Sequence, residues 1–140
     1  MSPDLWIWGV RAAGVFHFVT LALAWRTPIP PDWERNLAAL PDIHRRFAVA
    51  QNAAVGAVMA VFGAVCLGLA PELVAGAPTA RAWSAAIALW WGGRLVVLPW
   101  LGVRPTLTTP WLRAGYRALQ AECAAYAVLF AWLAVRGSGT

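Results

Sequence analysis

The sequence predicts an all-α protein, an integral membrane four-helix transmembrane bundle that forms a single domain over residues 1–140. Hydrophobic residues make up 61% of the chain and charged residues only 12%, whereas about a quarter of a soluble domain is charged. The mean hydropathy is +0.61. Ten tryptophans gather mainly near the ends of long apolar segments, where amphipathic indole rings favour the membrane–water boundary.

Four segments have close to the ~20 residues that a helix needs to cross the hydrocarbon core. We expect them at residues 5–25, 47–70, 82–101 and 112–135. The first also resembles a signal peptide, because "ALAW" at 22–25 offers an Ala-x-Ala site. Asp4 lies where such a peptide is basic and His17 interrupts its apolar run, so we interpret this segment as a retained span.

Prolines and small residues organise these segments. Pro28, Pro30 and Pro31 cannot continue a helix, whereas Pro110 suits the first turn of the fourth segment. Small residues spaced four apart on one helix face let another helix approach closely in lipid. The second segment carries such a stripe: Asn52, Gly56, Ala60, Ala64 and Gly68.

The arginines predict the orientation in the membrane. The net charge is +5, but the arginines mostly flank apolar segments, so we expect anionic membrane lipids and no nucleic acid as partners. The first and third connections, with the adjoining helix ends, hold Arg26, Arg35, Arg45, Arg46, Arg104, Arg113 and Arg117. The opposite side holds Arg81 and Arg136. The positive-inside rule then predicts a bacterial inner (cytoplasmic) membrane protein with both termini in the periplasm.

Each segment also contributes a polar residue at a similar depth, about 9–15 Å from the expected cytoplasmic edge. Such residues usually face the bundle interior and are paired or hydrated. We therefore predict that Arg94 pairs with Glu122, directly or through one water, and that this layer is either structural or a ligand pocket. The candidate ligand-binding residues are His17, Gln51, Asn52, Arg94, Glu122 and Tyr126.

A second set of residues is expected to face lipid headgroups at the membrane interface. It contains His44, Arg45, Arg46, Arg104 and Arg113. The two histidines of the chain could suggest a bis-histidine haem, but His17 lies roughly 10 Å deeper than His44. We therefore expect no metal site, and the sequence leaves any cofactor unknown. Cys66 and Cys123 fall at different depths, so we expect free thiols.

Two short stretches resemble small bacterial members of the MAPEG superfamily: "AVAQN" at the start of the second segment and "GGRLVVLPWLGVR" at the end of the third. The resemblance implies a four-helix membrane protein, typically a trimer, in which several members conjugate or isomerise lipophilic substrates with glutathione. Asn52 would match the second-helix asparagine of the family and Arg94 its third-helix arginine. The chain has Val55 in place of a family acid and Trp100 near the position of a family tyrosine.

Two functions from different classes remain open. The first is a binding or accessory protein, whose polar layer holds a lipophilic small molecule (a lipid, quinone or isoprenoid) or secures a partner subunit or a second copy. The second is a MAPEG-like membrane enzyme, in which Arg94, Arg45 and Arg46 hold an anionic cosubstrate such as glutathione and Glu122 or His17 moves a proton. The missing family acid favours the first function.

Overall fold

The computed structural model describes residues 3–27 and 32–136, and these residues form helices and turns but no strand. The four long helices are α1 (Pro3–Arg26), α3 (Asp42–Gly68), α5 (Pro78–Trp100) and α6 (Pro110–Val135). Three short elements lie in the connections: α2 (Trp33–Ala38), α4 (Ala70–Ala75) and the 3-10 turn η1 (Arg104–Thr106). Residues 28–31, which include three prolines, lie outside the described part.

Prolines, capping side chains and polar residues determine the helix ends more closely than the limits of the apolar segments do. α3 begins at Asp42, well before the expected start at 47, because Pro41 ends the preceding chain and polar residues continue the helix beyond the apolar run. α6 begins with Pro110 in its first turn, and the Thr109 side chain caps it by accepting a hydrogen bond from the Leu112 N–H at 3.2 Å. Gly76 ends α4 in the left-handed conformation at φ 76°, which glycine adopts without a steric penalty.

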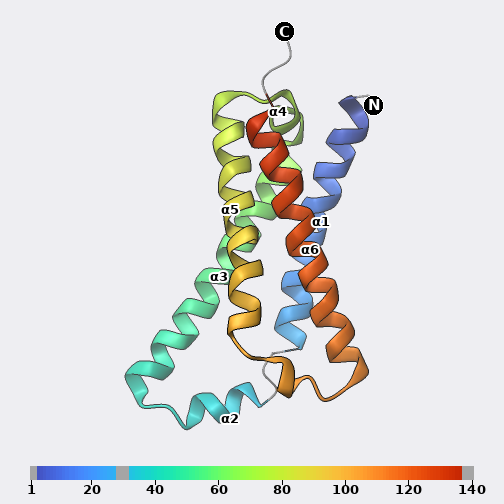
Figure 1. Cartoon of the computed structure of the whole chain (residues 1–140). Helices are drawn as coiled ribbons and strands as arrows, with labels where there is room; N and C mark the ends of the chain where they lie inside the picture. Colours follow the sequence, from blue (N-terminus) through green and yellow to red (C-terminus); the bar gives the residue numbers. More distant parts are fainter. Residues whose placement is uncertain (1–2, 28–31, 137–140) are drawn as a thin grey trace.

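The four long helices form two pairs, as Figure 1 shows. α1 packs mainly against α3, and α5 packs along α6. Both ends of the described chain and α4 lie at one end of the bundle, whereas α2 and η1 lie at the other (Figure 1). At the first end the indoles of Trp6 and Trp132 stack with their centroids 4.4 Å apart, which fixes the start of α1 against the end of α6.

The core is densest between the middle of the bundle and the end that carries α4. Its largest fully buried side chains include Trp91, Phe130, Leu73, Ile87 and Leu133. The described buried residues of α3 begin only at Met59. The first half of α3 accordingly diverges from the other long helices (Figure 1).

α1 and α3 approach each other closely at Gly14 and Gly63, and Gly63 lies outside the small-residue stripe of α3. A Cβ atom on Gly14 would lie 2.9 Å from Leu67 Cγ and 3.0 Å from the Gly63 carbonyl oxygen. A Cβ atom on Gly68, by contrast, would meet nothing within 4 Å. Within the stripe, a Cβ atom on Gly56 would lie 3.4 Å from Leu21 of α1, whereas Asn52, Ala64 and Gly68 are exposed. Packing of another subunit on the stripe therefore stays a prediction.

Three described helices are long and apolar enough to cross a membrane: α1, α3 and α6. α5 has 23 residues, or about 35 Å at 1.5 Å per residue, so its length is also sufficient. Its mean hydropathy is reduced by Arg81, Arg94 and four tryptophans. Composition therefore identifies three of the four expected spans.

Candidate functional site

His17 is the centre of a closed hydrogen-bond network that joins three helices. The side chain is fully buried, and its Nδ1 lies 2.7 Å from the Ala13 carbonyl oxygen. The Trp91 indole donates to His17 Nε2 at 3.0 Å, so the network assigns the proton of a neutral ring to Nδ1. Tyr126 stacks on the imidazole at 4.5 Å and donates its hydroxyl to the same Ala13 carbonyl at 3.1 Å.

This network satisfies both nitrogens of His17. A histidine that acts as a base or a metal ligand needs one nitrogen free for the substrate or the metal. In this arrangement His17 instead connects α1 with Trp91 of α5 and Tyr126 of α6. The network therefore supports a structural role for His17 and Tyr126, two of the six candidate ligand-binding residues.

Glu122 binds a hydroxyl that the sequence analysis did not assign to it. The Thr20 hydroxyl lies 2.8 Å from each carboxylate oxygen, and this contact joins α1 to α6. Two ion pairs occur within 4.0 Å in residues 3–27 and 32–136, Arg35–Asp32 and Arg45–Asp42, and neither involves Glu122. Arg94 and Glu122 therefore form no direct ion pair in the described residues, and a contact through one water stays a prediction.

The position of Trp91 on α5 determines the direction of Arg94. Trp91 is fully buried between His17 and Tyr126, so it occupies the face of α5 that points to α1 and α6. Arg94 lies three residues later, about 60° around the helix. Its guanidinium carbon lies 5.7 Å from the centre of the Trp91 ring, which is within the range of a cation–π contact.

Arg94 instead lines an open groove of about 320 Å³ between α3 and α5. Apart from the arginine, the groove is lined by Val55, Leu89, Trp90, Gly93 and Val97. Two donors here are buried and have no hydrogen-bond partner among the described residues, Arg94 Nε and Trp90 Nε1. A Cβ atom on Gly93 would meet nothing within 4 Å, so the groove is open beside the arginine.

Gln51 and Asn52 do not join the other polar residues of the predicted layer. Both side chains are exposed, in the half of α3 that diverges from the bundle. The structure therefore divides the predicted layer into the His17–Tyr126 network, the Glu122–Thr20 contact, the Arg94 groove and this exposed pair. The spacing along each helix determines the depth of these residues, but it does not determine the direction in which each side chain points.

The expected headgroup residues also divide into two groups. His44 and Arg46 are exposed on α3, and Arg45 pairs with Asp42 one turn earlier. Arg104 and Arg113 line a second pocket together with Leu107, Tyr116, Arg117 and Gln120. Tyr116 was not among the predicted site residues, although one helix face with the i, i+3, i+4, i+7 spacing carries Arg113, Tyr116, Arg117 and Gln120.

No set of three or more His, Cys, Asp or Glu side chains that could hold a metal ion occurs in the described ranges. Cys66 and Cys123 are both buried and free, as predicted. Comparisons of the chain with protein-family models, curated proteins and solved structures found no match. The arrangement of the site therefore carries the functional argument.

Proposed function

We propose that this chain is a four-span membrane protein that binds a lipophilic molecule in the groove between α3 and α5. One observation carries the proposal: Arg94 and Trp90, whose Nε and Nε1 donors are buried without a partner in the described residues, both line an open, mainly apolar groove. A buried donor without an acceptor is costly, and the cost is greater for a charged group. A ligand that brings an acceptor oxygen would remove this cost.

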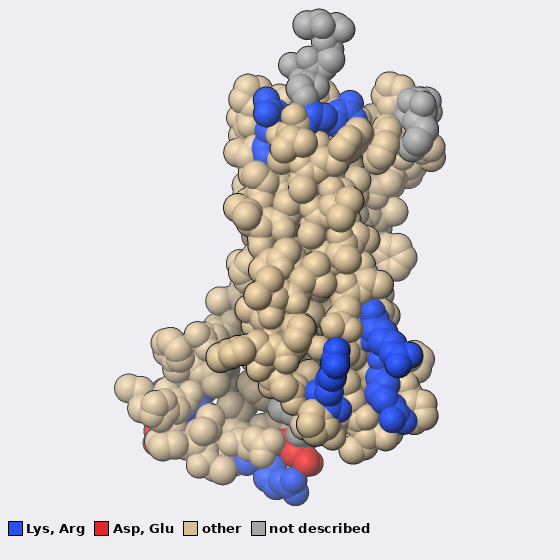
Figure 2. Space-filling view, in the orientation of Figure 1, with Lys and Arg blue, Asp and Glu red and all other residues tan. Residues whose placement is uncertain are grey.

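The surface of the bundle supports the four-span arrangement. α5 runs beside α6 along its length, so a membrane crossed by α6 would also surround α5. On α5, Leu89 is 77% exposed and Val96 is 76% exposed, as expected for side chains that face lipid. Figure 2 shows arginines near both ends of the molecule and an uncharged surface between them.

The positions of the exposed tryptophans indicate the thickness of this uncharged band. Trp8 and Trp25 are exposed near opposite ends of α1, about 26 Å apart along the helix. This distance is close to the ~30 Å thickness of a hydrocarbon core. Trp100 and Trp111 are also exposed, at the end of the bundle where α5 finishes and α6 begins, as an aromatic belt requires.

The charges support a direction across the membrane. The end that carries α2 and η1 also carries most of the arginines, which favours the cytoplasm for this end. Both termini would then lie in the periplasm of a bacterial inner membrane, on the side of α4. Arg94 lies six residues before Trp100, or about 9 Å from the cytoplasmic belt, so a ligand head would sit below the headgroups and its tail among the lipid chains.

The chemistry of the groove favours a ligand with an acceptor head and an apolar tail. Arg94 offers a permanent positive charge and several N–H donors in one plane, and Trp90 adds a single donor. Quinone carbonyls and the anionic heads of lipids or isoprenoids present the complementary acceptors. Val55, Leu89 and Val97 supply apolar contacts for a tail.

The surroundings of Arg94 favour binding over catalysis. Among the described lining residues of this groove, Arg94 is the titratable one, and an arginine stays protonated in proteins, so it does not serve as a base. The residues that could move a proton are engaged elsewhere, because His17 is bonded at both nitrogens and Glu122 is bonded to Thr20. These contacts support a binding protein over the MAPEG-like enzyme.

The proposal can be tested by extracting what the purified chain retains in a mild detergent. Mass spectrometry of an organic extract should find about one lipophilic molecule per wild-type chain. Arg94→Met removes the charge, and Gly93→Leu fills the groove without changing a charge. Each variant should retain at least about tenfold less ligand, the effect of losing roughly 1.4 kcal/mol of binding free energy.

Gly9→Leu is the matched control, because a Cβ atom on Gly9 also meets nothing within 4 Å and this glycine lies in α1, away from the groove. It should retain the wild-type amount. Equal retention in all four chains, or none in the wild type, would contradict the proposal. Glutathione-dependent conversion of a lipophilic electrophile would instead support the enzyme.

A further inference from the structure

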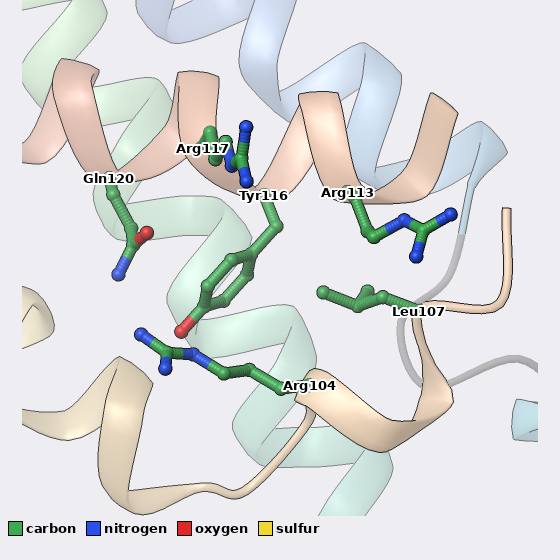
Figure 3. Close-up of a pocket in the computed structure, with 6 residues that line it drawn as sticks. All are labelled: Arg104, Leu107, Arg113, Tyr116, Arg117 and Gln120. Atoms are coloured by element: carbon green, nitrogen blue, oxygen red, sulfur yellow. The ribbon is translucent and has the colours of Figure 1, made fainter. Parts of the chain in front are cut away.

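A second pocket, of about 310 Å³, lies where the connection between α5 and α6 meets the first turns of α6. η1 contributes Arg104, the following turn contributes Leu107, and α6 contributes Arg113, Tyr116, Arg117 and Gln120. Figure 3 shows the Tyr116 ring crossing the pocket, with its hydroxyl and the Gln120 amide both directed toward the Arg104 guanidinium. This pocket is distinct from the groove at Arg94, and its residues do not overlap with that lining.

The Tyr116 hydroxyl is the unusual feature of this pocket. The side chain is 5% exposed, and its oxygen is buried without a hydrogen-bond partner in the described part of the chain. A tyrosine hydroxyl that is withdrawn from water normally finds a partner. Its neighbours in the pocket are mostly donors, since Arg104, Arg113 and Arg117 have no acceptor atoms in their side chains.

The three arginines carry positive charge that no described carboxylate neutralises. The ion pairs within 4.0 Å in residues 3–27 and 32–136 involve Arg35 and Arg45, and neither includes a lining residue of this pocket. Arg113 and Arg117 lie four residues apart on α6, a spacing at which like charges repel. The pocket therefore combines unbalanced positive charge with a buried hydroxyl that has no partner in the described residues.

A phosphate group matches these properties. Its several oxygens can accept hydrogen bonds from guanidinium groups in pairs, as well as from a tyrosine hydroxyl. The start of a long helix adds a favourable field for an anion, and Arg113 lies in the first turns of α6. In Figure 3 the Arg113 and Arg117 guanidinium groups both point away from the Tyr116 hydroxyl, but these exposed side chains have the rotamer freedom to turn toward a bound anion.

We infer that this pocket binds one phosphate group, held by Arg104, Arg117 and the Tyr116 hydroxyl, with Gln120 and Arg113 at its edges. The group belongs either to a phospholipid head or to a soluble phosphate. Exposed Trp100 and Trp111 lie in the flanking segments, at the level of lipid heads in the proposed membrane arrangement. The charge and donor arguments hold for either source and do not depend on the groove at Arg94.

The inference can be tested on the full chain in a neutral detergent, with binding measured by native mass spectrometry and by the shift in melting temperature. The probes are inorganic phosphate, short-chain phosphatidic acid, and short-chain diacylglycerol as the matched lipid without phosphate. Phosphatidic acid should bind and diacylglycerol should not. Binding of inorganic phosphate as well would identify a site that also accepts a soluble source, and binding of phosphate without the lipid would assign the soluble source alone.

The variants separate this site from general attraction to a basic surface. Arg104→Gln with Arg117→Gln should weaken binding of the successful probe by about tenfold or more, because each charge-assisted hydrogen bond is among the stronger kind. Tyr116→Phe removes only the hydroxyl, so it should weaken binding by a smaller factor of roughly three to ten. Arg26→Gln is the control, because Arg26 is exposed at the end of α1 and lies outside the pocket lining.

Failure of both phosphate probes to bind the wild-type chain would overturn the inference. Equal weakening by Arg26→Gln and by the double arginine variant would also overturn it, because the attraction would then be nonspecific. Tyr116→Phe retains the ring that fills the pocket wall, so its fold can be checked by its melting curve without ligand. If Tyr116→Phe folds and binds as tightly as the wild type, the assignment of the hydroxyl is wrong.

Discussion

The His17 network gives the sharpest prediction about stability, because all of its partners are buried and identified. His17→Leu keeps a side chain of moderate size but removes the acceptor of the Trp91 indole, which donates to Nε2 at 3.0 Å. The Trp91 N–H would then be buried without a partner, which costs about 1–3 kcal/mol. The Ala13 carbonyl loses less, because the Tyr126 hydroxyl still donates to it.

A double-mutant cycle isolates this contact. Trp91→Phe removes the donor, and the combination with His17→Leu removes both partners, so the pair should cost less than the sum of the single changes. We expect a coupling free energy of about 1–2 kcal/mol, since hydrogen bonds between membrane helices seldom contribute more. Tyr126→Phe should lower the free energy of unfolding by less than His17→Leu, because the Ala13 carbonyl oxygen still accepts a hydrogen bond from His17 Nδ1.

The assay is reversible unfolding of the purified chain in mixed micelles, followed by far-UV circular dichroism as a denaturing detergent is added. Each variant is compared with the wild type under the same micelle composition. A coupling free energy indistinguishable from zero would refute the argument. So would a Tyr126→Phe variant that loses as much stability as His17→Leu, because the Ala13 carbonyl would then depend on the tyrosine alone.

Two further predictions concern the helix contacts and the topology. Gly14→Ala should destabilise the bundle by about 1–3 kcal/mol, because the added Cβ meets the Gly63 carbonyl oxygen at 3.0 Å. Gly9→Ala is the control: its added Cβ meets nothing within 4 Å, so it should stabilise α1 by about 0.5–1 kcal/mol. Equal effects of the two variants in an unfolding titration would contradict this packing. Single cysteines at Thr79 and Thr108, both exposed, should react with an impermeant maleimide from opposite sides of the membrane, with Thr108→Cys reacting only when the cytoplasmic face is accessible. The native thiols are fully buried and should not react, and labelling of both sites from one side would remove the four-span arrangement.

The sequence alone predicted the helices well, because hydropathy and proline positions act over a few residues. The all-helical class, the four long segments and the free cysteines follow from composition and spacing. The predicted positions of the helix ends were less exact, since Asp42 and its polar neighbours extend α3 beyond the apolar run. The pocket around Tyr116 was also accessible to sequence reasoning, because its α6 members share one helix face.

The tertiary structure decided which polar residues meet. Counting residues along a helix gives the depth of His17, Asn52, Arg94 and Glu122, but it leaves the rotation of each helix about its axis open. The Gly14–Gly63 contact and the burial of Trp91 fix those rotations. They turn Glu122 toward Thr20 and Arg94 toward the groove, and the divergence of α3 leaves Asn52 exposed. The reason is physical: depth depends on the spacing within one helix, whereas direction depends on the packing of side chains between helices.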